Sequence, residues 1–358
     1  MIKPIPGFPL PPAVLLLALA LTAGPGWSQD DADTAFIAPL ASSNVLLLDV
    51  VNIDGHIVAV GERGVILISD DQGRSWKQSK VPSRAVLTGV FFHDRNLGWA
   101  VGHDSIVLKT TDGGESWKVT HFAPELELPL FDIWFADAEN GMAVGAYGFV
   151  IVTDDGGETW EESALDALEF GAVVEDQAVE ETGGLEDDGE EEDDAFWVEE
   201  DLPADYHLNV MVDDRNGHLL IAAEAGNIYR SDDGGDSWVL MPSFYPGSFF
   251  GATATGDGEV YVTGLRGHLF RSRDGGESWE DLDTGVETSL NGAVPLSGDG
   301  LAVVGMSGTL LISRDGGGSF ELVQQSNRKA LMNAMPVADG GLLLFGEAGV
   351  TRLEPGEF

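Results

Sequence analysis

The chain has 358 residues and no cysteine, and its 61 Asp and Glu residues against 18 Lys and Arg residues give a formal net charge of −43. The lack of cysteine excludes disulfides, thiolate metal sites and a lipid-modified cysteine. The strong acidity argues against nucleic acid and anionic lipid headgroups as partners.

The first 28 residues are predicted to be a signal peptide. Lys3 supplies a sparse positive start, and residues 13–21 form an apolar stretch too short to span a bilayer. Gly26 and Ser28 then give the small residues of a cleavage site before Gln29. An uncleaved anchor is the alternative, and otherwise we expect an exported, soluble, periplasmic protein.

One eight-residue pattern occurs six times after this segment. It reads Ser or Thr, any residue, Asp, any residue, Gly, two further residues and an aromatic, at 69–76, 110–117, 153–160, 231–238, 272–279 and 313–320. The closing aromatics are separated by 41, 43, 78, 41 and 41 residues, so one interval holds a period plus an insertion. A period of this length is typical of propellers with one four-stranded blade per repeat.

The pattern resembles the Asp box, the repeat of bacterial neuraminidases. Short Asp and Ser side chains bond nearby backbone N–H groups in tight turns, and the closing Trp begins the outgoing strand. We therefore expect a structural role for Asp71, Asp112, Asp155, Asp233, Asp274 and Asp315 and for Trp76, Trp117, Trp160, Trp238 and Trp279. A calcium loop is the alternative, but no copy carries the Glu that completes a twelve-residue loop, so no metal site is predicted.

A short turn framed by small residues precedes each Asp box and occurs once more near the C-terminus. These turns span 61–64, 102–105, 145–148, 223–226, 264–267, 305–308 and 346–349, which predicts seven blades. In the second blade we expect strands at 88–92, 98–101, 106–110 and 116–120. The seventh repeat stops after three strands, and residues 34–40 are predicted to supply its outer strand.

The predicted fold is therefore all-β: one seven-bladed β-propeller over residues 34–354, closed by pairing of its N-terminal and C-terminal strands. An acidic insertion at 166–205 separates blades three and four. Residues 175–201 contain fifteen Asp or Glu and no Lys or Arg, which is typical of disorder. Phe196 and Trp197 are exceptions that we expect to dock on the propeller or on a partner.

In a four-stranded blade, the turn between the second and third strands shares a face with the crossing to the next blade, opposite the Asp boxes. On this face we place candidate partner-binding residues Arg63, Lys80, Arg84, His103, Tyr147, Arg266, Arg328 and Lys329. Blades seven and one are neighbours, so five of these residues form a predicted basic sector suited to a complementary partner. Ordinary exposed charges without a partner are the alternative.

A sialidase-like hydrolase is the enzymatic alternative, and a glycan-binding propeller is its non-catalytic counterpart. Glycosidases need two carboxylates at a defined separation. Only Asp49 and Asp132 stand in predicted inner strands, and no Glu–Tyr pair accompanies the arginines. We predict no catalytic residues and no cofactor.

The repeats resemble the photosystem II stability/assembly factor family. The resemblance rests on 96–102 (NLGWAVG) and 106–118 (IVLKTTDGGESWK), and more weakly on 139–145 (ENGMAVG). It implies a seven-bladed, non-catalytic, monomeric propeller, periplasmic or thylakoid-lumenal, that binds a membrane-protein subunit and helps to assemble a complex. The family's arginine patch would map partly onto Arg63, Arg84, Arg266 and Arg328. The acidic insertion departs from the family, and a relative serving another envelope complex, such as an exporter, is equally compatible.

Overall fold

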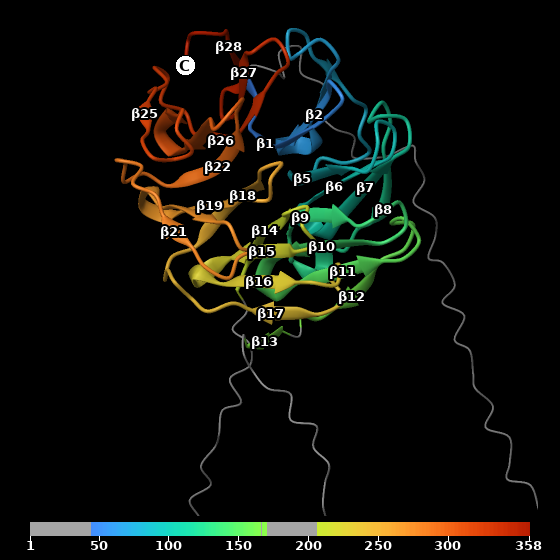
Figure 1. The fold of residues 1–358 in the computed structure, drawn as a ribbon. Helices are drawn as coiled ribbons and strands as arrows, with labels where there is room; N and C mark the ends of the chain where they lie inside the picture. The colour runs from blue at the N-terminus through green and yellow to red at the C-terminus, as the bar shows by residue number, and fades with distance from the viewer. Residues whose placement is uncertain (1–43, 166, 170–205) are drawn as a thin grey trace, which may run out of the picture. The chain divides into compact units, whose positions relative to one another are not determined.

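The computed structural model describes residues 44–165, 167–169 and 206–358, which form seven β-sheets joined by turns and short 3-10 segments. The sheets follow one another in a ring from the first to the last (Figure 1). The all-β, seven-bladed fold is thereby confirmed. The predicted signal peptide, residues 34–40 and most of the insertion lie outside the described residues.

Each sheet is one blade, numbered here in chain order, with its strands antiparallel and consecutive from the inside outward. Blade one holds β1 (Leu47–Ile53), β2 (His56–Gly61), β3 (Ile66–Ser69) and β4 (Lys77–Gln78). Blade two holds β5 (Leu87–Phe92), β6 (Gly98–Gly102), β7 (Ile106–Thr110) and β8 (Lys118–His121). Blade three holds β9 (Leu130–Phe135), β10 (Gly141–Gly145), β11 (Val150–Thr153) and β12 (Glu161–Ser163). Blade four holds β14 (Leu208–Asp213), β15 (Leu219–Ala223), β16 (Ile228–Ser231) and β17 (Trp238–Leu240); blade five β18 (Phe249–Ala254), β19 (Val260–Gly264), β20 (Leu269–Ser272) and β21 (Glu280–Asp281). Blade six holds β22 (Leu290–Pro295), β23 (Leu301–Gly305), β24 (Thr309–Ser313) and β25 (Glu321–Leu322), and blade seven β26 (Leu331–Pro336), β27 (Leu342–Gly346) and β28 (Gly349–Leu353).

Blades seven and one meet directly, so the ring closes through side chains. Asn333 Nδ2 of β26 donates to Asp49 Oδ1 of β1 over 3.0 Å, and Arg352 Nη1 of β28 donates to the Gln72 carbonyl over 2.5 Å. Within the described residues, blade seven has three strands. The predicted pairing of residues 34–40 with this blade stays a prediction.

Blade four has a fifth strand. β13 (Ala167–Glu169) follows blade three in the chain and pairs in parallel with β17, on the outside of blade four. The insertion was predicted to begin at residue 166, so its first residues build a strand that the periodicity did not indicate. Residues 170–205 lie outside the described part of the chain.

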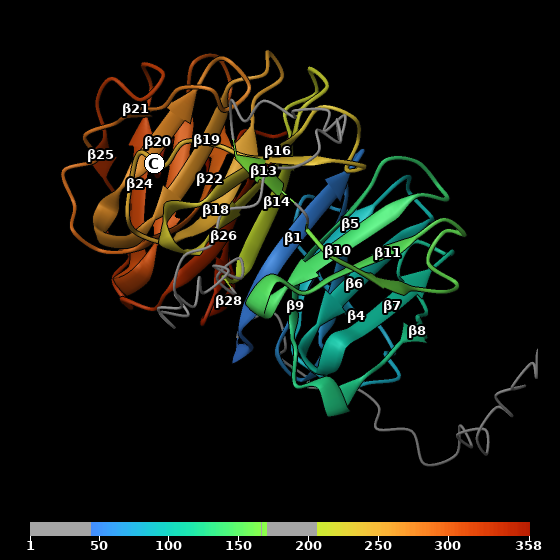
Figure 2. The same cartoon turned by 90° about the horizontal axis from the view of Figure 1, so that it is seen from below.

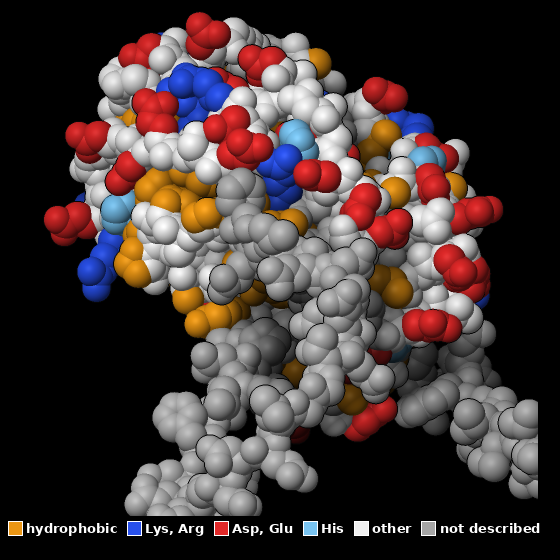
Figure 3. Space-filling view, turned by 60° about the horizontal axis from the view of Figure 1, so that its bottom comes forward, with side chains coloured by type: hydrophobic (Ala, Val, Ile, Leu, Met, Phe, Trp, Pro, Cys, Tyr) orange, Lys and Arg blue, Asp and Glu red, His pale blue; other side chains and the backbone are white. Residues whose placement is uncertain are grey.

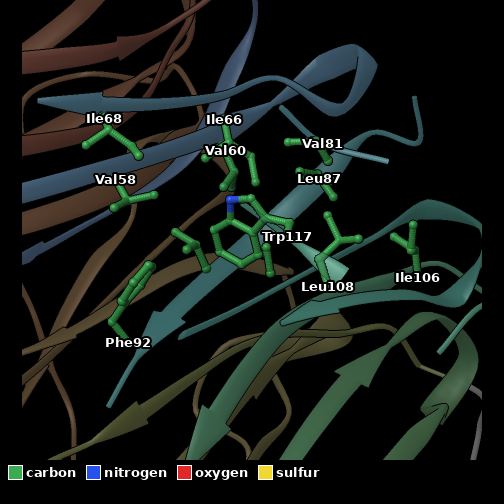
Figure 4. Close-up of a cluster of buried hydrophobic side chains, with 12 residues drawn as sticks. Val58, Val60, Ile66, Ile68, Val81, Leu87, Phe92, Ile106, Leu108 and Trp117 are labelled. Atoms are coloured by element: carbon green, nitrogen blue, oxygen red, sulfur yellow. The ribbon is translucent and has the colours of Figure 1, made fainter. Parts of the chain in front are cut away.

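The hydrophobic core lies between neighbouring blades. The inner strands of adjacent blades run beside one another (Figure 2), and second strands such as β6 are buried along their whole length. Between blades one and two, Val58 and Ile68 face Phe92 and Trp117 (Figure 4), whose ring centroids are 6.1 Å apart at 88°. Each large side chain buried in this way contributes about 1.5–3 kcal/mol.

The six Asp boxes share one hydrogen-bond pattern. In the first, Asp71 Oδ1 accepts from Ser75 N and Ser69 Oγ over 2.8 and 2.9 Å, and Ser69 Oγ accepts from Gly73 N over 3.0 Å. Hydrogen bonds from the Ser75 side chain and backbone lower the pKa of Asp71 to about 2. The box therefore fixes the turn between the third and fourth strands by satisfying its backbone donors.

Candidate functional site

The short-turn face is the face that carries the 3-10 turns between second and third strands. They are η2 (Glu62–Gly64), η3 (His103–Ser105), η5 (Ala146–Gly148), η6 (Glu224–Gly226), η7 (Leu265–Gly267) and η8 (Met306–Gly308). The middle residue of each has a positive φ between 53° and 62°, so its side chain marks the apex of the turn. The apex residues are Arg63, Asp104, Tyr147, Ala225, Arg266 and Ser307.

Three of the predicted partner-binding residues occupy equivalent apex positions. Arg63, Tyr147 and Arg266 are all exposed there. His103 is also exposed, but it is the first residue of η3, and Asp104 takes the apex of that blade. The apex of this turn therefore carries the Asp104 carboxylate, and the predicted His103 imidazole lies beside the apex.

The predicted basic sector divides into two pairs. The backbone of Arg84 lies against Gly64, which places it beside Arg63 at blades one and two. Arg328 lies against Gly308 of η8, and Lys329 Nζ donates to the Glu347 carbonyl over 3.2 Å. The turn of blade seven, with the exposed Glu347, stands between the pairs.

Lys80 lies elsewhere than predicted. Its backbone bridges to Ser116, a residue of the Asp box of blade two, and the preceding Ser79 Oγ donates to the Gly114 carbonyl over 2.6 Å. The chain after β4 therefore packs against the neighbouring blade's Asp box. Lys80 belongs to the outer wall there, and the sector loses this member.

Large apolar side chains are exposed on the short-turn face. Tyr147 is 59% exposed, Met306 42%, Phe250 40% and Leu265 36%. Leu265 and Met306 are the first residues of η7 and η8, and Asn291 Nδ2 lies 3.6 Å from the sulfurs of both Met306 and Met332. Figure 3 shows hydrophobic side chains gathered among Asp and Glu side chains on one face of the molecule. Of these residues only Tyr147 was predicted from the sequence. The signal for Leu265 and Met306 is a bulky apolar residue at the first turn position, where other repeats have Glu, His or Ala.

Tyr147 is the apolar apex with the most defined surroundings. Its backbone N–H donates to His207 Nδ1 over 3.0 Å, and the two rings are 4.6 Å apart. The His207 ring also meets Phe131 of β9 edge-on at 5.5 Å. This aromatic group stands where the chain re-enters the propeller after the acidic insertion.

Two partly buried carboxylates, Asp49 and Asp132, lie in inner strands. Asp49 Oδ2 accepts from Val90 N over 2.9 Å, and Asp132 Oδ2 accepts from Met211 N over 2.7 Å, so each bridges to the next blade. Burial raises the pKa of Asp49 to about 6, and burial with repulsion from Asp49 raises the pKa of Asp132 to about 7. The second oxygen of each carboxylate also accepts a hydrogen bond. Asp49 Oδ1 accepts from Asn333 Nδ2, and Asp132 Oδ1 accepts from Ile133 N.

In residues 44–165, 167–169 and 206–358, no three His, Asp or Glu side chains come together in an arrangement fit for a metal ion. The same segments contain no helix with the length and apolar character needed to cross a bilayer.

Two family models match short parts of the chain. The photosynthesis system II assembly factor YCF48 model matches residues 74–128, and the BNR/Asp-box repeat model matches residues 151–162. No curated protein sequence matches the chain.

Solved structures match almost the whole propeller at low sequence identity. YCF48 bound to D1 peptide has a TM-score of 0.65 at 19% identity, covering 91% of this chain and 98% of that one. YCF48 from Cyanidioschyzon merolae has a TM-score of 0.62 at 15% identity, covering 89% and 97%. A streptogramin B lyase has a TM-score of 0.65 at 13% identity, covering 89% and 96%. Together with the family models, these matches support a photosystem II assembly factor-like propeller.

Proposed function

We propose that this protein is a non-catalytic, exported propeller that binds a segment of a membrane-protein subunit and assists the assembly of a membrane complex. The observation that carries the proposal is the apolar and cationic surface of the short-turn face. Exposed apolar side chains that gather in a contiguous patch mark interaction sites, whereas single scattered ones do not. The likeness to YCF48, one structure of which holds a D1 peptide, supports a peptide segment of a membrane protein as the ligand.

The two kinds of side chain on this face suit one kind of ligand. Tyr147, Leu265 and Met306 offer apolar contact, and Arg63 and Arg266 offer positive charge within a strongly acidic molecule. An extended segment with apolar side chains and a carboxylate matches both. Within this proposal the protein works as a monomer in the periplasm or an equivalent lumen, and its partner belongs to a photosystem or another envelope complex.

A hydrolytic function is the competing proposal, because propeller enzymes are among the structural neighbours, including an ancestral GH74 enzyme with a TM-score of 0.56 at 14% identity. A glycosidase needs one carboxylate free to act as a base or nucleophile and one as an acid. Here Asp49 and Asp132 direct their oxygens to the backbone of neighbouring blades. We therefore favour binding without catalysis.

Site-specific photo-crosslinking tests this proposal. A photoreactive residue at Leu265 or Met306 is expected to crosslink to a membrane protein in detergent-solubilised host membranes, whereas the exposed Ser297, in the turn after β22, serves as the control on the Asp-box face. Charge reversal of Arg63 and Arg266 together should weaken that crosslink. Equal crosslinking from all three positions would remove the short-turn face from the proposal, and hydrolysis of a fluorogenic sialoside or a xyloglucan oligosaccharide would replace it with an enzymatic one.

A further inference from the structure

The seam between blades three and four differs from the seam between blades two and three. Between blades two and three, Trp99 stacks on Phe135 with ring centroids 3.5 Å apart and an interplanar angle of 11°. Phe135 is the last residue of the inner strand β9 and pairs with Gly141. The equivalent residue of blade four, paired with Leu219, is Asp213, which is exposed. Blade four therefore has no ring at this position to stack on Met142, the blade-three counterpart of Trp99, although its Trp238 packs in the same buried cluster as Met142.

The Asp-box glycines report the same opening. A Cβ added to Gly113, Gly156 or Gly275 would meet an atom of the preceding blade, at 3.5 Å from His56, 3.4 Å from Lys109 and 2.5 Å from His218. A Cβ added to the equivalent Gly234 of blade four would meet nothing within 4 Å. At Gly234 the Asp box of blade four thus stands away from blade three, whereas a Cβ added to Gly235 would lie 3.7 Å from Met142 Cε.

A cleft of about 490 Å³ occupies this seam on the Asp-box side. Its apolar walls come from Trp134, Met142, Val152 and Trp238. Among the ring contacts of the described residues, none involves Trp134 or Trp238, whereas the Asp-box Trp residues of the first three blades each meet a Phe edge-on at 88°. The volume lies within the range of ligand-binding clefts.

The rim of the cleft is acidic. Asp154, Glu161 and Asp236 are exposed lining residues, and no residue lining the cleft is Lys or Arg. None of the ion pairs formed by the described residues uses these three carboxylates. The partly exposed Trp134 and the neighbouring apolar wall, below three carboxylates, form a site for a cation with an apolar stem.

We propose that this cleft binds an arginine side chain carried by an extended segment of a partner protein. The methylene stem packs along Met142 and Val152, the guanidinium faces an indole ring, and its N–H groups reach the carboxylates of the rim. The chain's own Phe196 and Trp197 are poorer occupants, because Asp193, Asp194, Glu199 and Glu200 flank them and would meet like charge at the rim. This site is independent of the proposed function and lies on the opposite face from it.

The test is fluorescence polarisation of the full chain with a fluorescein-labelled decapeptide of alternating arginine and serine. A glutamate–serine peptide is the negative probe. Val152→Phe fills the cleft without changing the charge, and we expect it to weaken binding about tenfold, the equivalent of about 1.4 kcal/mol. The triple variant D154N/E161Q/D236N should weaken binding by a similar factor, and it changes only exposed side chains, so it decides the matter if Val152→Phe fails to fold.

A matched control removes the same three charges elsewhere. Asp54, Glu125 and Glu321 are exposed and lie outside the cleft, so D54N/E125Q/E321Q should change the affinity less than about twofold, as expected for screened surface charges. Three results would overturn the proposal: wild-type protein that does not bind the arginine peptide, undiminished binding by a folded Val152→Phe variant, or equal losses in the two triple variants. Either of the last two would mean that the peptide is held by the overall negative charge.

Discussion

Replacement of Asp132 by Asn is expected to change how the stability of the propeller depends on pH. Burial and the neighbouring Asp49 raise the pKa of Asp132 from 3.8 to about 7, and burial raises the pKa of Asp49 to about 6. A carboxyl whose pKa is higher in the folded than in the unfolded state binds its proton more tightly after folding. These two groups therefore make the protein lose stability as the pH rises from about 4 to about 7, with no further change from them above that range.

The magnitude follows from the shifts. One pKa unit corresponds to about 1.4 kcal/mol, so the ionised forms of Asp132 and Asp49 cost at most about 4 and about 3 kcal/mol. Both side chains are half-buried, and partial solvation reduces these costs, so we expect about 2 kcal/mol from Asp132. Asp132→Asn removes this titration, but its amide nitrogen cannot accept from Met211 N or Ile133 N, a loss of about 1–3 kcal/mol at every pH.

The free energy of unfolding, measured by urea denaturation at pH 5, 6, 7 and 8, tests this reasoning. At pH 5 the wild-type protein should be more stable than Asp132→Asn, and by pH 8 the gap should shrink by about 1 kcal/mol, because part of the loss occurs below pH 5. Asp54→Asn, at an exposed turn, serves as the control with no change in the gap. If the difference in the free energy of unfolding between wild type and Asp132→Asn is the same at pH 5 and pH 8, the raised pKa and the burial that explains it are refuted.

Three further predictions concern stability. Asp112→Ala removes the acceptor of Ser116 N and Ser116 Oγ and should lower the free energy of unfolding by about 1–2 kcal/mol. Asp112→Asn keeps one acceptor oxygen and should lose less. Equal losses of the two variants in urea titrations would contradict this account of the Asp box. Arg352→Ala breaks contacts with Asp339, Glu354 and the Gln72 carbonyl and should loosen the junction of blades seven and one by about 1–2 kcal/mol, and Arg352→Lys should recover part of it. Deletion of residues 34–40 should lower the thermal midpoint and speed amide exchange in β28; unchanged exchange there would mean that blade seven does not use this segment.

The period of the Asp boxes predicted a propeller, and the seven short turns predicted the number of blades, because the turn residues are local requirements of the repeat. The third strand of blade two was predicted at 106–110 and β7 spans Ile106–Thr110. The outer strand was predicted from Ser116, but β8 begins at Lys118. Asp112 binds both Ser116 N and Ser116 Oγ, so this residue completes the turn before the strand can start.

The candidate site was less accessible to sequence reasoning, because it depends on which repeat positions reach the surface. The apex of each short turn is set by a positive φ at its second residue, which selects Arg63 and Arg266 but not His103. Placing Lys80 required knowledge of how the chain after β4 packs on blade two. Leu265 and Met306 were not predicted as surface residues, because apolar residues next to a predicted strand are assigned to the core unless the turn geometry is known.

A repeat protein also supplies its own controls, because departures at equivalent positions can be compared within one chain. Blade four has two features of its own. Asp213 places a carboxylate where blades two and three have Phe92 and Phe135 and the other blades have Ile, Ala or Pro, and β13 adds a parallel strand to its outer edge. An unfilled seam loses dispersion contacts and hence stability. β13 continues directly from blade three and pairs its backbone with blade four, so it ties the two blades together at the rim. We infer that this strand offsets the missing ring and allows the cleft between blades three and four to remain open in a stable propeller.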